Sequence, residues 1–343
     1  SKIVRENFNG KIIAITGSCG KTSLKELLGN TINKYSTATI SPKSFNNKYG
    51  VPLSLFNLNL NHKNGVFEIG MDKKGEINFL SKIVSPDIGV ITNISYAHAK
   101  NFKNIYQIAR AKSEIINNIK KDGSLVLNAD DKFHSFHKKI AFKKKLKIYS
   151  FSSKKRTDVY LKHIKKELKR YKISVKINKQ TKYFYVNSVY ENFLKNLLAC
   201  ITILYILNDI NSLNPFSFYN DKIPEGRGDI SKLKFRNKNI FLIDESYNSN
   251  PLSLESAIKN FDLINVKSSK KHLVIGDMLE LGKYSKKLHI QISKVINLSS
   301  IGTVSVFGKA VKETYKKIKT EKRGIILKEI PKIFDLIVNN LNN

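Results

Sequence analysis

The stretch Lys11–Thr22, which reads KIIAITGSCGKT, decides the fold. Its first half, Lys11–Thr16, is a short apolar run that is typical of a buried strand. Gly17 and Gly20 then predict a tight turn, and the spacing of the apolar residues after it predicts a helix over Ser23–Asn33. A strand, a glycine-rich turn and a helix in this order indicate a parallel α/β domain.

The turn at Thr16–Thr22 has the composition of a phosphate-binding loop. Its glycines allow backbone N–H groups to surround phosphate oxygens, and the N-terminus of the following helix adds positive potential. Lys21 can reach the β- and γ-phosphates of a nucleotide, and the Thr22 hydroxyl can coordinate Mg²⁺. The strict G-x-x-x-x-G-K-[ST] pattern is not met, because Ile15 occupies its first glycine position. A glycine turn with a chance lysine is the alternative, and the strand and helix on either side disfavour it.

The alternation of strands and helices continues through the first half of the chain. Buried strands are predicted at Gly65–Gly70, Asp87–Ile94 and Ser124–Asn128, and a helix at Ile105–Ile119. From about Lys145 to Val189, apolar and polar residues alternate, which predicts a small antiparallel sheet with one wet face. A long helix at Glu191–Asn208 follows.

A second domain is expected after a stretch rich in proline, asparagine and serine, Asn208–Pro224. Strands are predicted beyond it at Ile240–Asp244, His272–Gly276 and Gly302–Phe307, with helices between them. We therefore expect an α/β protein of two domains. Residues 1–220 would form a central ATP-binding domain with a P-loop-type, mostly parallel sheet and a small antiparallel subsheet, and residues 221–343 an incomplete, Rossmann-like C-terminal α/β domain.

The composition excludes several classes of protein. No apolar run is long enough to span a bilayer, so no membrane partner is expected. Cys19 and Cys200 cannot form a disulfide framework, which fits a reducing cytoplasm. The formal net charge is +34, yet only seven of the 61 basic residues are arginine. Because nucleic-acid binders rely on arginine, we attribute the charge to AT-rich coding and expect no nucleic-acid partner.

Three residues beyond the loop are candidates for metal chemistry. Glu68 lies at the end of a very apolar strand, where an unpaired carboxylate is costly to bury. A salt bridge to a lysine would satisfy it, but at the carboxyl ends of parallel strands it could also bind Mg²⁺ beside Thr22. His98 follows the next strand and would lie at the same edge. Nothing local distinguishes Lys112 from a surface lysine.

These residues resemble those of the Mur ligase family, which makes precursors of the bacterial cell wall. The loop TGSCGKT resembles the nucleotide loop of the family. Further segments are similar to the MurF type, which adds D-alanyl-D-alanine to UDP-N-acetylmuramoyl-tripeptide. They are FNNKYGVPLSL (45–55), FEIGMDKKGEI (67–77), RAKSEI (110–115), LNADD (127–131), DESYNSNP (244–251) and GDMLELG (276–282). They follow the order of the family and span nearly the whole chain.

The resemblance implies an ATP-dependent amide ligase of peptidoglycan synthesis. ATP would phosphorylate the terminal carboxylate of the UDP-linked tripeptide, and the amine of D-alanyl-D-alanine would attack the acyl phosphate. Two Mg²⁺ ions would screen the repulsion between these anions. Lys112 matches the lysine that family members carry as a carbamate, which converts a cation into an anionic metal ligand. We expect a monomer whose partners are these small-molecule substrates.

The same resemblance assigns roles to individual residues. The catalytic set is Lys21, Glu68, His98 and Lys112. The metal ligands are Thr22, Glu68, His98 and carbamylated Lys112. The ATP-binding residues are Thr16, Gly17, Ser18, Cys19, Gly20, Lys21, Thr22, Asn128, Arg227, Asp244 and Asn248. The substrate-side residues are Asn46 and Asn47. The segment GDMLELG is interpreted as structural, and DESYNSNP could also be no more than a strand, a turn and a helix cap.

The chain departs from the family pattern in three places. Glu191 stands where the family has histidine. The N-terminal UDP-binding domain is absent, and the Lys-Gly-Ser-Arg segment of the family should follow Leu341, so we expect a fragment. The alternatives are another amide ligase of this fold, such as folylpolyglutamate synthase, and a truncated ATP-binding fragment without ligase activity. A basic nucleotide-binding protein acting on nucleic acid is a further alternative.

Overall fold

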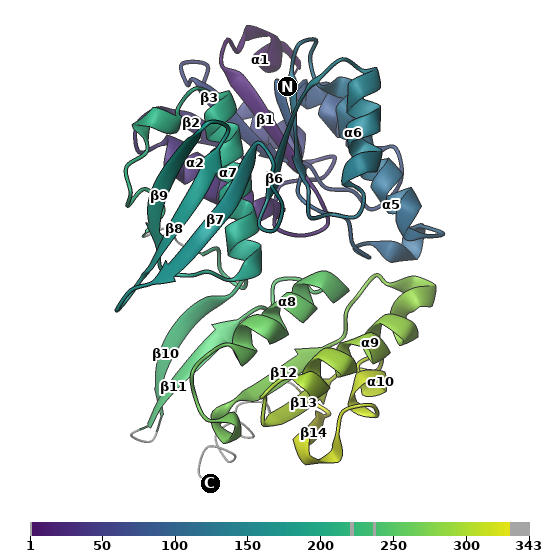
Figure 1. Cartoon of the computed structure of the whole chain (residues 1–343). Helices are drawn as coiled ribbons and strands as arrows, with labels where there is room; N and C mark the ends of the chain where they lie inside the picture. Colours follow the sequence, from purple (N-terminus) through teal and green to yellow (C-terminus); the bar gives the residue numbers. More distant parts are fainter. Residues whose placement is uncertain (1, 220–222, 236–237, 330–343) are drawn as a thin grey trace. The chain divides into compact units, whose positions relative to one another are not determined.

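The structure, a computed structural model, describes residues 2–219, 223–235 and 238–329, which form two compact units (Figure 1). Unit 1 comprises Ser1–Ile94 and Phe102–Lys222, and unit 2 comprises Ser95–Asn101 and Ile223–Asn343. The expected boundary between residues 220 and 221 lies outside the described residues, as does the segment expected after Leu341. The grouping of Ser95–Asn101 with unit 2 has no counterpart in the sequence pattern.

Unit 1 alternates strands and helices, as the sequence predicted. Its helices are α1 (Lys2–Asn7), α2 (Lys21–Ile32), α3 (Gly50–Phe56), α4 (Glu76–Val84), α5 (Ile105–Lys112), α6 (His134–Lys143) and α7 (Glu191–Ile206), with 3₁₀ turns η2 (Ser113–Asn118) and η3 (Ile210–Ser212). Its strands are β1 (Lys11–Thr16), β2 (Ala38–Ile40), β3 (Asn64–Glu68), β4 (Ile88–Ile91), β5 (Ser124–Asn128), β6 (Lys147–Ser152), β7 (Val159–Lys166), β8 (Tyr171–Ile177) and β9 (Gln180–Val186).

These strands form one sheet in the order β2-β3-β1-β4-β5-β6-β7-β8-β9. The strands from β2 to β7 run parallel, and β8 and β9 then pair antiparallel. The predicted antiparallel sheet is therefore not separate: it continues the parallel sheet edge to edge, and β6 belongs to the parallel part. The prediction of a mostly parallel α/β fold with a small antiparallel subsheet is confirmed.

Strand β1 lies in the middle of the parallel part, and both of its faces are buried. On one face, Ile13 and Ile15 belong to the same buried cluster as Leu24 and Leu28 of α2 and Leu197 of α7. The intervening residues of the strand are equally buried on the other face. A strand covered on both faces reads as a continuous apolar run, which is why its sequence does not alternate. In the described part of the chain, no helix is long and apolar enough to cross a membrane.

The predicted helix Ile105–Ile119 is wrong in its second half. The α-helix ends at Lys112, and a 3₁₀ turn, Ser113–Asn118, follows. The Ser113 hydroxyl donates to the carbonyl of Arg110 at 2.7 Å, a local bond that competes with helical geometry. The Glu114 carboxylate also accepts from the backbone N–H of Gly75 at 3.0 Å, which draws this turn toward α4.

Unit 2 contains two small sheets. Strands β10 (Asp229–Phe235) and β11 (Lys238–Asp244) form an antiparallel pair, and β12 (His272–Gly276), β13 (Thr303–Phe307) and β14 (Arg323–Leu327) form a parallel sheet. Its helices are α8 (Pro251–Asp262), α9 (Ser285–Leu298) and α10 (Lys312–Tyr315), with 3₁₀ turns η1 (Ala99–Asn101), η4 (Ser268–Lys270), η5 (Gly282–Tyr284) and η6 (Thr320–Lys322). The three strands predicted here are all present, although β11 pairs antiparallel.

We predict that Ile13→Ala lowers the free energy of unfolding by about 2–5 kcal/mol, because it leaves a cavity against two helices in the middle of the sheet. The urea-unfolding midpoint measures the effect. Ile3→Ala is the matched control: Ile3 is 73% exposed and its loss should change stability by no more than about 0.5 kcal/mol. Equal effects of the two substitutions would contradict the assignment of the core.

Candidate active site

The loop Thr16–Thr22 connects β1 to α2 and is shaped by two glycines. Gly17 has φ of 148°, and a Cβ there would lie 1.9 Å from the Thr92 hydroxyl. Gly20 precedes the first helical residue with φ of 79°, and a Cβ there would lie 2.7 Å from Asn196 Oδ1. Larger residues are therefore excluded by both backbone conformation and space. Lys21 Nζ donates to the carbonyl of Gly17 at 3.1 Å, so its ammonium group folds back over the loop.

Two residues after β4 hold this loop, and sequence reasoning missed them. The backbone N–H groups of Ser18 and Cys19 donate to the carbonyl and the side-chain oxygen of Asn93, both at 2.9 Å. The Thr92 hydroxyl donates to the carbonyl of Cys19 at 2.6 Å. Their signal was a threonine and an asparagine directly after a buried strand that neighbours β1. The loop thus has a fixed conformation before any phosphate binds.

A buried carboxylate stands beside the loop. Glu68, at the end of β3, is 1% exposed and accepts the Thr22 hydroxyl hydrogen bond at 2.6 Å. Its second oxygen accepts from the side-chain amide of Asn46 at 2.7 Å. No lysine or arginine forms an ion pair with it among the described residues, so the salt-bridge interpretation of Glu68 is not supported. The structure brings together three residues that the sequence predicted for the site.

Lys112, at the end of α5, is also buried, with 1% exposure. Burial lowers the pKa of its amine well below the ordinary value, and the positive charge of Lys21 lowers it further. The negative potential of Cys19 and Glu68 acts in the opposite direction without cancelling the effect. No described residue offers its Nζ atom a hydrogen bond or an ion pair. The interpretation of Lys112 as a surface lysine is therefore wrong.

Asn47 and Asn128 are engaged within unit 1. Asn47 Oδ1 accepts from the backbone N–H groups of Tyr49 and Gly50 at 3.0 and 2.9 Å, at the start of α3. The Asn128 amide donates to the carbonyl of Thr92 at 3.1 Å, and its oxygen accepts from Asp130 N at 2.9 Å. These bonds give both side chains a structural role, and their roles at the substrate and the nucleotide base stay predictions.

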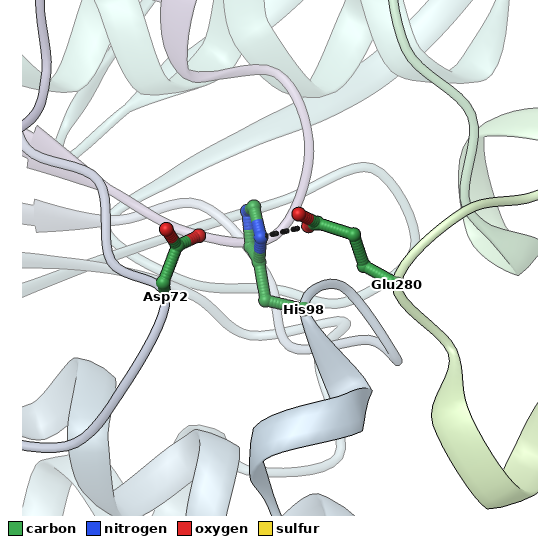
Figure 2. Close-up of side chains that lie close together, drawn as sticks. All are labelled: Asp72, His98 and Glu280. Atoms are coloured by element: carbon green, nitrogen blue, oxygen red, sulfur yellow. Dashed lines mark ion pairs between the residues drawn. The ribbon is translucent and has the colours of Figure 1, made fainter.

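His98 belongs to unit 2, where it forms an ion pair with Glu280 (Figure 2). Glu280, which also pairs with Lys100 at 3.2 Å, lies in the loop after β12. Partial burial acts to raise the pKa of Glu280, but His98 and Lys100 outweigh it and hold the pKa below its ordinary value. Sequence reasoning missed this partner, because GDMLELG was interpreted as structural only. The metal role of His98 stays a prediction.

The other predicted nucleotide residues of unit 2 gather at one end of the β10–β11 hairpin. The antiparallel register places Asp229 opposite Asp244, and Arg227 lies two residues before Asp229. The Arg227 guanidinium lies over the Tyr247 ring, 4.2 Å from its centroid. Asn248, next to Tyr247, accepts from Ser249 N through its own side-chain oxygen at 2.8 Å. The hairpin thus explains how residues 17 positions apart, Arg227 and Asp244, come together.

The segment DESYNSNP also forms a helix cap. The Asn250 side chain accepts from Leu252 N and Ser253 N, the Ser253 hydroxyl accepts from Asn250 N at 3.0 Å, and Pro251 occupies the first turn of α8. This is the strand, turn and cap that the sequence offered as the structural alternative. Glu191, which replaces the histidine of the family pattern, pairs with Lys195 at 2.7 Å and with Lys154 at 3.4 Å.

The side chains of unit 1 fit a nucleotide with Mg²⁺. A hydroxyl and a carboxylate, which Mg²⁺ prefers as oxygen donors, lie 2.6 Å apart beside the phosphate loop. The buried Thr16 hydroxyl at the start of the loop has no hydrogen-bond partner among the described residues. Buried polar groups are rarely left unsatisfied without a reason.

Comparison with known proteins identifies the family. Residues 15–204, more than half of the chain, match the Mur ligase middle domain. The UDP-N-acetylmuramoyl-tripeptide–D-alanyl-D-alanine ligase of Buchnera aphidicola subsp. Baizongia pistaciae is 33% identical over 90% of this chain and 66% of its own length. The ligase of the same name from Buchnera aphidicola subsp. Acyrthosiphon pisum is 32% identical over 95% of this chain and 70% of its length. The chain thus spans about two thirds of the length of these relatives.

A solved structure agrees with this result. The MurF ligase from Thermotoga maritima in complex with ADP superimposes with a TM-score of 0.84 and 25% identity, covering 97% of this chain and 75% of that chain. The family-level interpretation of the sequence motifs is therefore confirmed. The chain belongs to the Mur ligase family and, within it, to the MurF type.

Proposed function

We propose that this chain is an ATP-dependent ligase that joins D-alanyl-D-alanine to UDP-N-acetylmuramoyl-tripeptide in peptidoglycan synthesis. The observation that carries the proposal is the buried pair of Thr22 and Glu68 beside the phosphate loop. Lys112, in the same unit, is also buried and has no hydrogen-bond or ion-pair partner among the described residues. Relatives at 32–33% identity are named for this activity. The phosphate loop alone would support many nucleotide-dependent reactions, so the choice of substrates is supported by the names of these relatives.

The loop Thr16–Thr22 is suited to bind the triphosphate of ATP. The backbone N–H groups at the N-terminus of α2 would supply hydrogen-bond donors and positive potential for the phosphates, while those of Ser18 and Cys19 hold the loop against Asn93. Lys21 would turn from the carbonyl of Gly17 to the phosphate oxygens. Thr22 and Glu68 would hold Mg²⁺, which withdraws charge from the transferred phosphoryl group. Glu68 stays oriented because Asn46 binds its other oxygen.

The lowered pKa of Lys112 favours the neutral form of its amine, which can react with carbon dioxide. An amine reacts with carbon dioxide as the neutral base: the nitrogen lone pair forms a bond to carbon, one proton leaves to solvent, and a carbamate anion remains. Burial in unit 1 lowers the pKa of the amine and thereby favours the neutral form that this step requires. The product would place a carboxylate-like group where an ammonium ion would repel Mg²⁺.

Ligation requires that the acyl phosphate, which is an anion, is held close to the amine that attacks it. The terminal carboxylate of the tripeptide takes the γ-phosphoryl group of ATP, and the amine of D-alanyl-D-alanine then displaces phosphate from the acyl phosphate. Asn46 and Asn47, beside Glu68, would orient the tripeptide. Arg227, Asp244 and Asn248 are the further ATP-binding residues of the proposal. Asn128 would contact the nucleotide base, and His98 would assist the second metal ion. We further propose a cytoplasmic monomer of two domains.

The test of the proposal is phosphate release from ATP in the presence of both substrates, with each omitted in turn. We predict that release requires the UDP-muramoyl-tripeptide and D-alanyl-D-alanine together, because the acyl phosphate forms on one and is consumed by the other. Mass spectrometry of the product should show the two joined by loss of water.

Other outcomes of this assay separate the alternatives. Phosphate release that is indifferent to both substrates would mean an ATP-binding fragment without ligase activity. Release that requires a folate and glutamate in their place would mean a folylpolyglutamate synthase.

We predict that Lys112→Ala loses ligase activity by at least about a hundredfold, because the carbamate that would bind Mg²⁺ beside the acyl phosphate is missing. Added bicarbonate should not restore the activity, since the variant has no amine to carbamylate. The assay is the same phosphate release with both substrates. Arg110→Ala, on the exposed side of the same helix, is the matched control and should keep its activity.

A second readout does not depend on catalysis. After incubation with ¹³C-bicarbonate, the parent chain should show a carbamate carbon resonance that Lys112→Ala lacks. Activity near that of the parent in Lys112→Ala, or a carbamate signal that persists in it, would contradict the assignment of Lys112.

A further inference from the structure

Lys25, in the middle of α2, is a lysine to which the mechanism gives no role. Its side chain is fully buried, with 0% exposure. In the sequence it is indistinguishable from the many lysines of this basic chain, most of which are expected at the surface. A buried ammonium group loses its hydration and persists only where other groups replace the water. The hydrogen-bond and ion-pair partners of Lys25 therefore indicate its role.

Three acceptors surround the ammonium group. Lys25 Nζ donates to the backbone carbonyls of Ser41 and Lys43 and pairs with Glu26 Oε1 at 2.9 Å. A lysine has three N–H donors, so its hydrogen-bonding capacity is filled. Both carbonyls belong to the loop between β2 and α3, and Lys43 adopts a left-handed conformation with φ of 45° that non-glycine residues disfavour. Lys25 thus ties the helix of the phosphate loop to this second loop.

The second loop leads directly to the candidate active site. The Ser41 hydroxyl accepts from the backbone N–H of Glu68 at 3.2 Å. Asn46 donates from its side chain to Glu68 Oε1 at 2.7 Å, and its carbonyl accepts from Gly70 N at 2.8 Å. The loop held by Lys25 therefore contacts the backbone on both sides of Glu68 as well as its carboxylate.

We propose that Lys25 is a positioning residue, which holds the loop from Ser41 to Asn46 so that it orients the Glu68 carboxylate toward Thr22. An apolar residue of similar length would fill the same space but leave the carbonyls of Ser41 and Lys43 without a donor. The loop would then be held at Ser41 and Asn46 only, and Asn46 would depend on its own hydrogen bonds to Glu68 and Gly70 to keep its position. The inference rests on the proposed function in one respect, that Glu68 binds Mg²⁺.

The first test uses the chain without nucleotide or metal, so it does not depend on the proposed function. Mass spectrometry measures hydrogen exchange in fragments that span Glu68–Gly70. The amide of Glu68 donates to the Ser41 hydroxyl, and the amide of Gly70 donates to the carbonyl of Asn46. We expect Lys25→Met to accelerate exchange there. Lys271→Met is the matched control: Lys271 is 2% exposed in unit 2 and donates to the carbonyl of Asp262 and the hydroxyl of Ser300. This control should leave exchange at Glu68–Gly70 unchanged.

The second test uses the ligase assay with Mg²⁺ varied at saturating ATP and substrates. Loss of groups that orient a metal ligand weakens metal binding, so Lys25→Met should raise the half-saturating Mg²⁺ concentration by about tenfold. The kcat at saturating Mg²⁺ should change less, because the metal can still be driven into place. Lys271→Met should alter neither value.

The outcomes are distinguishable. If Lys25→Met exchanges at Glu68–Gly70 as slowly as Lys271→Met, the positioning role is overturned, whatever the activity. If exchange accelerates but the parent chain shows no ligation, the proposed function fails and the positioning of Glu68 stands. If Lys25→Met does not fold, Lys25→Gln, whose side chain is uncharged and one atom too short to reach both carbonyls, carries the test against Lys271→Gln. Faster exchange in Lys25→Gln supports the proposal, and equal exchange overturns it.

Discussion

The candidate site depends on one buried carboxylate. Glu68 stands at the carboxyl end of β3 with 1% exposure, and its two oxygens accept from Thr22 and Asn46. No described cation forms an ion pair with it, and its two hydrogen-bond partners are neutral side chains. Such a group is costly in an apolar setting unless a cation is bound during function. The phosphate loop, the loop from Ser41 to Asn46 and the buried Lys25 all help to position this carboxylate.

The remainder of unit 1 serves to hold Glu68 beside the nucleotide loop. Strands β1 and β3 are neighbours in the sheet, with Ile15 and Glu68 in register. Since parallel strands end at one edge, Thr22 after β1 and Glu68 at the end of β3 meet there. Thr92 and Asn93, after β4, fix the loop from the other side. The candidate catalytic groups thus lie at the ends of strands and helices, namely Glu68 in β3, Thr22 in α2 and Lys112 in α5, and strands buried on both faces determine their positions.

Much of this arrangement could be predicted from the sequence, because neighbouring residues along the chain determine it. The apolar run at Lys11–Thr16, the glycines after it and the isolated Glu68 each carry a recognisable signal. The parallel sheet follows from the alternation of strands and helices, and its edge predicts where Thr22 and Glu68 meet. Lys112 could be singled out only through resemblance to the Mur ligases. Its burial depends on tertiary packing, which no window of sequence around it contains.

Other features could not be predicted, for physical reasons that differ from case to case. Lys25 and Lys112 are ordinary lysines in sequence, and only long-range packing buries them. The helix after Ile105 ends early because the Ser113 hydroxyl and the Glu114 carboxylate bond elsewhere. Glu280 is near His98 through a fold contact 182 residues apart in sequence, which periodicity cannot reveal. Sequence patterns thus predict elements and edges, whereas partners of single polar side chains require the folded chain.

We propose above all that Thr22 and Glu68 form a Mg²⁺-dependent nucleotide site. The most direct measurement is an equilibrium titration of ATP, with Mg²⁺ and with a chelator, on the parent chain and on Thr22→Val. This substitution keeps the shape of the side chain and removes its hydroxyl. We predict that Mg²⁺ strengthens ATP binding by the parent, and that Thr22→Val loses about tenfold or more of that gain. Equal affinity of the two chains for ATP with Mg²⁺ would contradict it.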